Sequence, residues 1–239
     1  MPICEVHEVT RTYGTGPTRV EALCGVSLTI EPGEFTVFQG PSGSGKTTLL
    51  NQIGCLDAPT GGELRIDGQS TRRLSSHALS RLRADKIGFI FQSFNLIPVL
   101  SAQENVELAL ELAWRQGSRR DAAAAMLEQV GLKELRHRRP NELSGGQQQR
   151  VAIARALVKK PLLVIADEPT ANLDSVNGEQ VLATMRRLNS ELGITFLFSS
   201  HDPRVIAHAT RVITLRDGRL VSDEAGPRAV AAVGREHAR

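Results

Sequence analysis

The stretch Gly40-Pro-Ser-Gly-Ser-Gly-Lys-Thr47 decides the fold, because it satisfies the pattern G-x-x-x-x-G-K-[ST] at every fixed position. Its three glycines let the backbone turn tightly and bring N–H groups against an anion without interference from a Cβ. Phe35–Phe38 before it predicts a buried strand, and Leu49, Leu50 and Ile53 after it have the spacing of a helix's apolar face. The alternative, a glycine-rich turn that binds nothing, does not account for this strand–loop–helix context. We therefore predict a phosphate-binding loop at the positive end of a helix.

The side chains that such a loop needs for a nucleoside triphosphate are also present. Lys46 supplies a positive charge, and the Thr47 hydroxyl can bind Mg²⁺. The apolar run Leu162–Ala166 predicts a central parallel strand buried on both faces. Open α/β sheets bind ligands at the carboxyl ends of their strands, and this strand ends in Asp167 and Glu168. We expect Asp167 to bind Mg²⁺ through water, and Glu168 to act as general base or to position the attacking water. The alternative is a solvated acidic strand end.

A histidine follows a second apolar strand. Ile194–Phe198 leads through two serines to His201. A histidine in this position is most often an ordinary hydrogen-bonded residue. Because the strand end corresponds to the one that carries Asp167 and Glu168, we expect His201 to sense the terminal phosphate or to orient Glu168.

The segment Leu143-Ser-Gly-Gly-Gln147 precedes a helical pattern and predicts a second anion site. Ser144 is a good N-cap, and glycines allow close approach to the positive end of the helix. This site lacks a lysine and a metal ligand, so we expect it to complete the nucleotide site of another copy of the chain. A simple helix cap would explain Ser144, but not the two glycines and Gln147.

Together these motifs resemble the nucleotide-binding domains of ABC transporters over essentially residues 3–223. The resemblance implies a homodimer that holds two ATP, each with Mg²⁺, between the loop 40–47 of one copy and Ser144–Gln147 of the other. It implies that Gln92 contacts Mg²⁺ and couples to a membrane partner, that Asp174 lies across the dimer seam, and that Tyr13 stacks on adenine. The residues implied to contact the nucleotide are Tyr13, Gly40, Pro41, Ser42, Gly43, Ser44, Gly45, Lys46, Thr47, Thr48, Ser144, Gly145, Gly146, Gln147 and Asp174. The implied metal ligands are Thr47, Gln92 and Asp167, and the implied catalytic residues are Glu168, His201 and Gln92.

Three further segments resemble one branch, the macrolide-export (MacB-type) and lipoprotein-release (Lol-type) ATPases: Gly54–Thr60, Ile87–Ile97 and Gln103–Glu107. That resemblance implies a MacB/FtsX-like integral-membrane permease on a separate chain, whose coupling helix contacts residues 93–105, and export or extraction of a substrate. One alternative is the cell-division ATPase of the same branch, which regulates wall hydrolases. Another is a soluble ABC ATPase acting on DNA, ribosomes or cofactor assembly. No heptad run lies between Gln92 and Leu143, and one such domain is present, which disfavours the soluble class.

Composition agrees with this interpretation. No apolar run in the 239 residues approaches the roughly 18 needed to cross a bilayer, and the first residues do not resemble a signal peptide. Cys4, Cys24 and Cys55 have no metal-binding or redox spacing, which is typical of free thiols in a reducing compartment. A net charge of +3 is too small to argue for nucleic acid. We expect a cytoplasmic protein, peripheral on the inner face of the membrane, with no nucleic-acid partner.

The predicted fold is α/β, a P-loop ATPase of the ABC type in one domain over residues 1–239. It should contain a parallel core sheet, an antiparallel β part with a turn at Asp67-Gly68, and a helical subdomain over about 95–158 that carries the signature segment. Helices are expected over 122–130, preceded by a capping box at Ser118, and over 175–192. Residues 224–239 are expected to form a tail. Trp114, in the helical subdomain, is as well suited to core packing as to contact with a partner.

Overall fold

The computed structural model describes residues 1–113 and 117–229. Its contacts divide the chain into two compact units. The first unit comprises residues 1–79 and the segment from 195 onward, and the second comprises residues 80–194. Each unit is described by itself. Trp114 and residues 230–239 of the expected tail lie outside the described residues.

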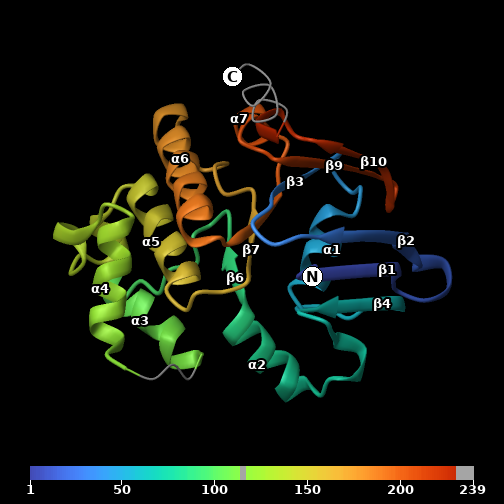
Figure 1. Cartoon of the computed structure of the whole chain (residues 1–239), viewed down its shortest axis with the longest axis horizontal. Helices are drawn as coiled ribbons and strands as arrows, with labels where there is room; N and C mark the ends of the chain where they lie inside the picture. Colours follow the sequence, from blue (N-terminus) through green and yellow to red (C-terminus); the bar gives the residue numbers. More distant parts are fainter. Residues whose placement is uncertain (114–116, 230–239) are drawn as a thin grey trace. The chain divides into compact units, whose positions relative to one another are not determined.

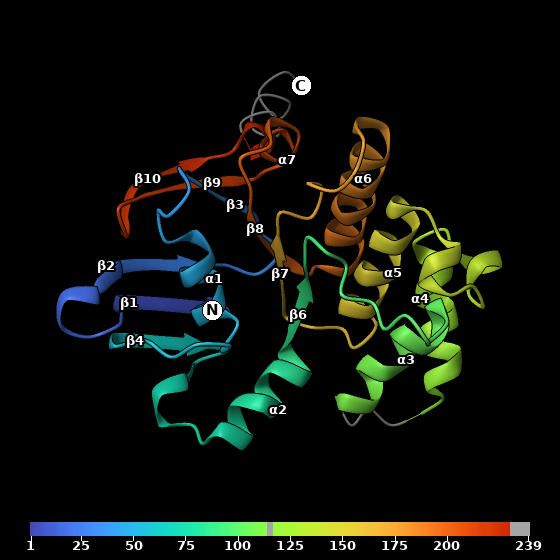
Figure 2. The same ribbon diagram turned by 180° about the vertical axis from the view of Figure 1, so that it is seen from behind.

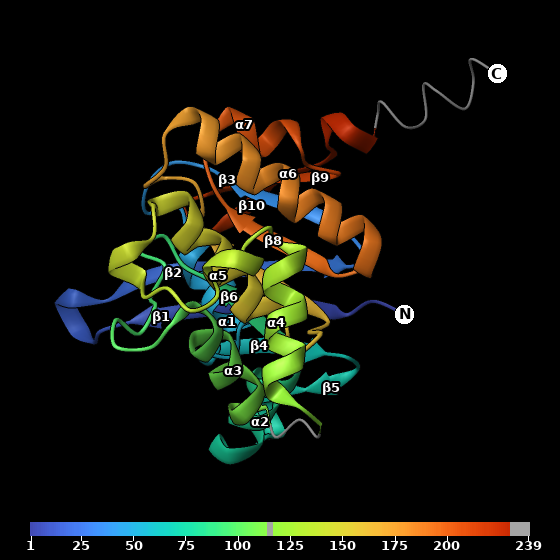
Figure 3. The ribbon, with the colours of Figure 1, turned by 90° about the vertical axis from the view of Figure 1, so that its left-hand side faces the viewer.

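The first unit contains an antiparallel sheet (Figure 1). Its strands are β1 (Cys4–Tyr13), β2 (Val20–Ile30), β4 (Gly61–Ile66) and β5 (Gln69–Ser70), in the order β2-β1-β4-β5. The short strand β5 is labelled in Figure 3. Ile66 pairs with Gln69, so Asp67 and Gly68 form a two-residue hairpin loop, and both have positive φ (52° and 73°). The turn expected at Asp67-Gly68 is therefore confirmed.

Parallel strands form the other sheet portion of the first unit. β3 (Phe35–Gln39) lies between β8 (Thr195–Ser199) and β9 (Arg211–Arg216) and pairs in parallel with both, and β10 (Arg219–Ala225) is antiparallel to β9. Phe35 packs on Phe198 with ring centroids 4.3 Å apart. The helices of this unit are α1 (Lys46–Ile53) and α7 (Pro203–Ala207), and α2 (Ser76–Lys86) contains the division between the units. The expected tail overlaps β10 at its start, because the strand extends to Ala225.

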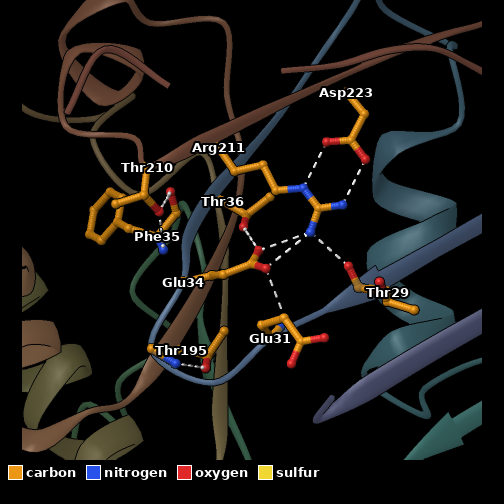
Figure 4. Close-up of polar contacts among 10 residues, drawn as sticks. Thr29, Glu31, Glu34, Phe35, Thr36, Thr195, Thr210, Arg211 and Asp223 are labelled. Atoms are coloured by element: carbon orange, nitrogen blue, oxygen red, sulfur yellow. Dashed lines mark hydrogen bonds and ion pairs between the residues drawn. The ribbon is translucent and has the colours of Figure 1, made fainter. Parts of the chain in front are cut away.

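Arg211, the first residue of β9, bonds to residues of β2 and β10 and to Glu34, which directly precedes β3 (Figure 4). Its guanidinium donates to both carboxylate oxygens of Asp223, at 2.7 and 2.6 Å, and to the Thr29 carbonyl at 2.7 Å. It also donates to the Glu34 carboxylate at 3.0 Å. The hydrogen bonds to Asp223 and the negative charge of Glu34 raise the pKa of Arg211 above its ordinary value. This planar, five-donor group therefore ties β2 and the start of β3 to β9 and β10.

The second unit combines two parallel strands with four long helices (Figure 2). β6 (Ile87–Ile90) pairs in parallel with β7 (Leu163–Asp167). The helices are α3 (Ala102–Leu112), α4 (Arg119–Gln129), α5 (Gly145–Leu157) and α6 (Ser175–Leu192), and α5 packs against α3, α4 and α6. Short 3₁₀ turns in the two units cover Gly16–Thr18, Thr71–Arg73, Lys133–Leu135 and Pro140–Glu142.

The helix predictions hold with small differences. Ser118 accepts a hydrogen bond from the Asp121 N–H as an N-cap, but α4 begins at Arg119, earlier than the expected residue 122. α6 has the predicted bounds, and Val181, Met185 and Leu188 are buried. Leu192, expected on the same face, is 41 % exposed because it is the last helical residue. Every helix in the described part of the chain is too short or too polar to cross a membrane.

Candidate functional site

The loop between β3 and α1 has the backbone that the glycine pattern predicts. Gly40, Gly43 and Gly45 all have positive φ (143°, 79° and 99°). A Cβ on Gly40 would lie 2.1 Å from the Leu215 carbonyl oxygen, so a side chain cannot be accommodated there. Ser44 is buried, whereas Pro41, Ser42 and Thr47 are at least partly exposed. The loop therefore presents its backbone and the Thr47 hydroxyl to solvent at the N-terminus of α1.

Lys46, the first residue of α1, folds back over this loop. Its ammonium donates to the Gly40 carbonyl at 2.8 Å and to the Pro41 carbonyl at 3.0 Å. Its charge is thus concentrated where loop N–H groups and the helix end already favour an anion.

Tyr13 stands at the end of β1 in a small polar cluster. Its hydroxyl donates to Asp57 Oδ2 at 2.7 Å, and the Arg11 guanidinium lies 4.5 Å from the ring centroid. Arg11 also forms an ion pair with Asp57 Oδ1 at 2.7 Å. Tyr13 is 39 % exposed, and the orientation of its ring is held from two directions. An oriented, partly exposed aromatic ring is suited to base stacking.

His201 lies at the same sheet edge as the phosphate loop. Phe38 pairs with Ser199 across β3 and β8, and the Ser200 N–H donates to the Phe38 carbonyl at 3.2 Å. The two parallel strands thus end side by side, one leading to Gly40 and the other to the exposed His201. The expected position of His201 at a strand end is confirmed.

In the second unit, Asp167 is the last residue of β7, and Gln92 follows the adjacent end of β6. Ile90 pairs with Ala166, so the next residues of both strands emerge at one edge. The Asn172 side chain donates to the Gln92 carbonyl at 3.0 Å. Glu168, directly after the strand, has a φ of 44°. A left-handed conformation in a glutamate costs about 1–3 kcal/mol and is typical of functional sites.

The signature segment forms a capped helix start. Ser144 Oγ accepts from the Gln147 N–H, and Gln147 Oε1 accepts from the Ser144 N–H, which is a complete capping box. A Cβ on Gly146 would lie 2.7 Å from Asn177 Oδ1, so close packing against α6 requires glycine there. We expected that a helix cap would explain neither Gln147 nor the two glycines. For Gln147 this expectation is wrong, because its side chain is part of the cap. Gly146 is explained by packing against α6. A Cβ on Gly145 would meet no atom nearer than 3.5 Å, so packing does not account for this glycine.

Asp174 is the N-cap of α6. It accepts from the Asn177 N–H at 2.9 Å and from the Asn177 side-chain amide at 2.6 Å. These hydrogen bonds, the backbone one first, lower the pKa of Asp174. Asp174 thus has a local structural role besides the one at a dimer seam that the resemblance implies.

The residues present suit ATP and Mg²⁺. The loop packs so closely that a Cβ on Gly45 would lie 2.6 Å from the Ala22 carbonyl oxygen, and its glycines leave the backbone N–H groups open to phosphate. Hard cations prefer oxygen ligands; Thr47 offers a hydroxyl oxygen in the first unit, and Gln92 and Asp167 offer amide and carboxylate oxygens in the second. Among residues 1–113 and 117–229, no cluster of three or more His, Cys, Asp or Glu could hold a metal ion.

Residues 23–171 match the model of the ABC transporter family. The chain belongs to the ABC transporter family. It is 49 % identical over 93 % of its length to the lipoprotein-releasing system ATP-binding protein LolD of Anaeromyxobacter dehalogenans, 94 % of which is covered. It is 48 % identical over 96 % of its length to the macrolide export ATP-binding/permease protein MacB of Hyphomonas neptunium. It spans only 36 % of that MacB.

A solved ABC cassette, MJ0796 as a dimer bound to ADP and Pi, has a TM-score of 0.85 and 46 % identity. The alignment covers 93 % of this chain and 98 % of that one. MJ0796 is a protein of Methanocaldococcus jannaschii. The predicted fold class and the resemblance to MacB- and Lol-type ATPases are thereby confirmed, and the chain is an ABC-type ATPase.

Several residues of this ABC ATPase have no signal in the sequence motifs. Asn177 donates a hydrogen bond to Asp174 and packs against Gly146. Arg155 donates to the carbonyls of Phe94 and Asn95, which are close in sequence to Gln92. Gln149 is buried and donates to the Pro169 carbonyl. For Gln149 one signal was available, since it shares the helical spacing of the buried residues Ala152, Ile153 and Ala156 on α5.

Proposed function

We propose that this chain is the ATP-hydrolysing subunit of a transporter that works as a homodimer around two ATP and drives a separate MacB- or Lol-type permease. The observation that carries the proposal is the signature segment Leu143–Gln147, which forms a capped helix start. Packing does not explain why residue 145 is a glycine, and the motif contains neither a lysine nor a metal ligand. Such a helix end favours an anion. The dimeric state of the ADP-bound relative supports the proposal that a second copy of the chain supplies the phosphate loop that completes this site.

Each proposed role follows the chemistry of the side chain. The loop 40–47 and Lys46 bind the phosphates, Thr48 follows Thr47 in the same turn of α1, and Tyr13 stacks on adenine. Thr47, Gln92 and Asp167 would hold Mg²⁺, which would supply positive charge to neutralise the phosphates. Glu168 accepts the proton of a water whose oxygen attacks the γ-phosphorus, while the bond to the β-phosphate oxygen breaks and leaves ADP and phosphate. His201 orients Glu168 or contacts the terminal phosphate. Asp174 and Ser144–Gln147 act at the dimer seam.

The permease partner is proposed from the relatives. LolD, which this chain covers over 94 % of its length, is described as an ATP-binding protein, whereas MacB is described as an ATP-binding/permease protein. The similarity to LolD is the ground for proposing that the permease is a separate chain. The same proposal places the protein in the cytoplasm, peripheral on the inner face of the membrane, and assigns export or extraction as the work done.

Glu168→Gln tests the chemistry. The amide cannot accept a proton, so kcat should fall by about 10²–10⁴-fold while ATP still binds. Lys46→Ala should instead raise the Kd for ATP. Steady-state hydrolysis and nucleotide titration measure the two effects, and wild-type turnover in Glu168→Gln would contradict the role of Glu168.

A pull-down tests the partner. Tagged Glu168→Gln is incubated with ATP and detergent-solubilised native membranes, with Lys46→Ala as the matched control that should not close a dimer. The expected result is ATP-dependent recovery of a permease with four membrane-spanning helices and a large extracytoplasmic domain. Recovery of soluble proteins or nucleic acid alone would overturn the transporter role and leave the ATPase chemistry intact.

A further inference from the structure

A buried glutamine connects the signature helix to the residue after Glu168. Gln149, on α5, is fully buried, and its Nε2 donates to the Pro169 carbonyl at 2.7 Å. Its Oε1 has no hydrogen-bond partner among the described residues. Because an unsatisfied buried polar atom costs about 1–3 kcal/mol, an apolar side chain would be the more stable choice at this position unless the bond to Pro169 matters.

That bond restrains the turn on which Glu168 is mounted. The proline ring fixes φ of Pro169, and the hydrogen bond fixes the direction of its carbonyl. On the other side, the Ala171 N–H donates to the Glu168 carbonyl at 3.2 Å. Glu168 itself has a φ of 44°, a conformation that persists only where neighbouring contacts determine it. The Gln149 bond is therefore one of the contacts that hold Glu168 in its left-handed conformation.

The same helix begins with the signature segment. Ser144 and Gln147 cap α5, and Gln149 lies within its first two turns. Further along, Arg155 donates to the Phe94 carbonyl at 2.8 Å and also to the Asn95 carbonyl. α5 therefore contacts the backbone that follows Glu168 and the backbone that follows Gln92.

We propose that Gln149 is a positioning residue for hydrolysis, which fixes the orientation of the Glu168 side chain through the Pro169 carbonyl. In this arrangement the position of the signature helix determines how well the general base of the same subunit is aimed. The inference rests on the proposed role of Glu168 and adds to it a mechanical connection to α5.

The first test is Gln149→Met, which keeps the side-chain volume and removes the amide. We expect kcat to fall by about 10- to 100-fold, as a misplacement of around 1 Å can produce, with the Kd for ATP unchanged. Asn189→Leu is the matched control, because the Asn189 amide also donates to a backbone carbonyl, that of Ile194, at 2.7 Å in a buried site. The control also removes the acceptor of a hydrogen bond from Arg186, so it should lose at least as much thermal stability and keep its kcat. Unchanged kcat in Gln149→Met, or an equal kcat loss in the control, would overturn the proposal.

A double-mutant cycle separates positioning from general damage. If Gln149 acts through Glu168, adding Gln149→Met to Glu168→Gln should cause no further loss of kcat. Losses that multiply would show that Gln149 acts by another route. Gln149→Leu, which also lacks a hydrogen-bond donor, is the second variant and carries the same expectations should Gln149→Met not fold.

The two proposals fail in different ways. Wild-type turnover in Glu168→Gln contradicts the general base and therefore the proposed chemistry. If kcat falls in Glu168→Gln but is unchanged in Gln149→Met, only the positioning role of Gln149 is contradicted.

Discussion

Tyr13 shows how a single side chain acquires a function through its neighbours. The sequence indicates only a strand-end aromatic at this position, and the adenine role comes from resemblance. In the structure the hydroxyl is bonded to Asp57 and the ring lies against Arg11, which itself pairs with Asp57. The ring is therefore oriented before any base arrives, which reduces the entropy lost on binding.

This arrangement predicts the effect of two substitutions at Tyr13. Tyr13→Ala removes the stacking surface, and base–aromatic stacking is worth about 1–3 kcal/mol, so the Kd for ATP should rise by about 5- to 150-fold. Tyr13→Phe keeps the ring and should change the Kd much less. Fluorescence titration with labelled ATP measures both, and an unaltered Kd in Tyr13→Ala would contradict the stacking role.

At the scale of elements, the caps of α5 and α6 in the second unit make specific predictions. The cap of α5 is a reciprocal pair between Ser144 and Gln147, and that of α6 is Asp174. The sequence predicts the Ser144 cap because serine is a favoured N-cap residue before a helical pattern, whereas the part that Gln147 takes in the cap is seen only in the structure. The Asp174 cap was not expected, since the resemblance drew attention to the dimer seam.

The α5 cap predicts a stability difference between two Ser144 variants. Ser144→Ala leaves the Gln147 N–H without its acceptor and should lower the free energy of unfolding by about 0.5–2 kcal/mol. Ser144→Thr retains a hydroxyl and should lose much less. Urea unfolding of the nucleotide-free protein followed by circular dichroism measures both, and equal stabilities would show that the cap contributes nothing.

The α6 cap predicts a pH dependence. Hydrogen bonds from Asn177 hold the pKa of Asp174 below its ordinary value of 3.8, so the charged form stabilises the folded state. This contribution is fully present above pH 3.8 and is lost as the pH falls through the lower folded pKa. The stability advantage of the wild type over Asp174→Asn should therefore be larger at about pH 7 than at about pH 3 in denaturant unfolding. An advantage that is the same at both pH values would contradict a charged cap.

At the scale of the whole molecule, one arginine connects distant segments of the first unit. In the first unit Arg211 connects segments as distant in sequence as Thr29 and Asp223. Arg211→Met removes the hydrogen bonds to Asp223, Glu34 and the Thr29 carbonyl, and each lost bond to a charged group costs about 1–3 kcal/mol. Glu34 keeps the hydrogen bonds from the Glu31 N–H and the Thr36 hydroxyl. Because the Arg211 side chain is 20 % exposed, water replaces part of the lost bonds.

We therefore expect Arg211→Met to lower Tm by several degrees without changing the kcat for ATP. Arg211→Lys keeps the charge but cannot form the bidentate pair with Asp223, so it should lie between the wild type and Arg211→Met. Differential scanning calorimetry provides the measurement. A Tm of Arg211→Met equal to that of the wild type would mean that the network adds nothing to stability.

The sequence by itself determined the phosphate loop, the strands that end at Asp167 and His201, the capped signature helix and the ABC family. Each of these is recorded in a short contiguous stretch, because hydrophobic period, glycine placement and capping are local properties. Only the tertiary structure decided the left-handed backbone of Glu168, the bond from Gln149 to Pro169 and the Arg211 network. These depend on which distant segments meet, and a glutamine or arginine looks the same in a sequence whether its partner is water or a buried carbonyl. The nucleotide-binding groups were thus predictable from local pattern, whereas the contacts that hold them in place follow from packing.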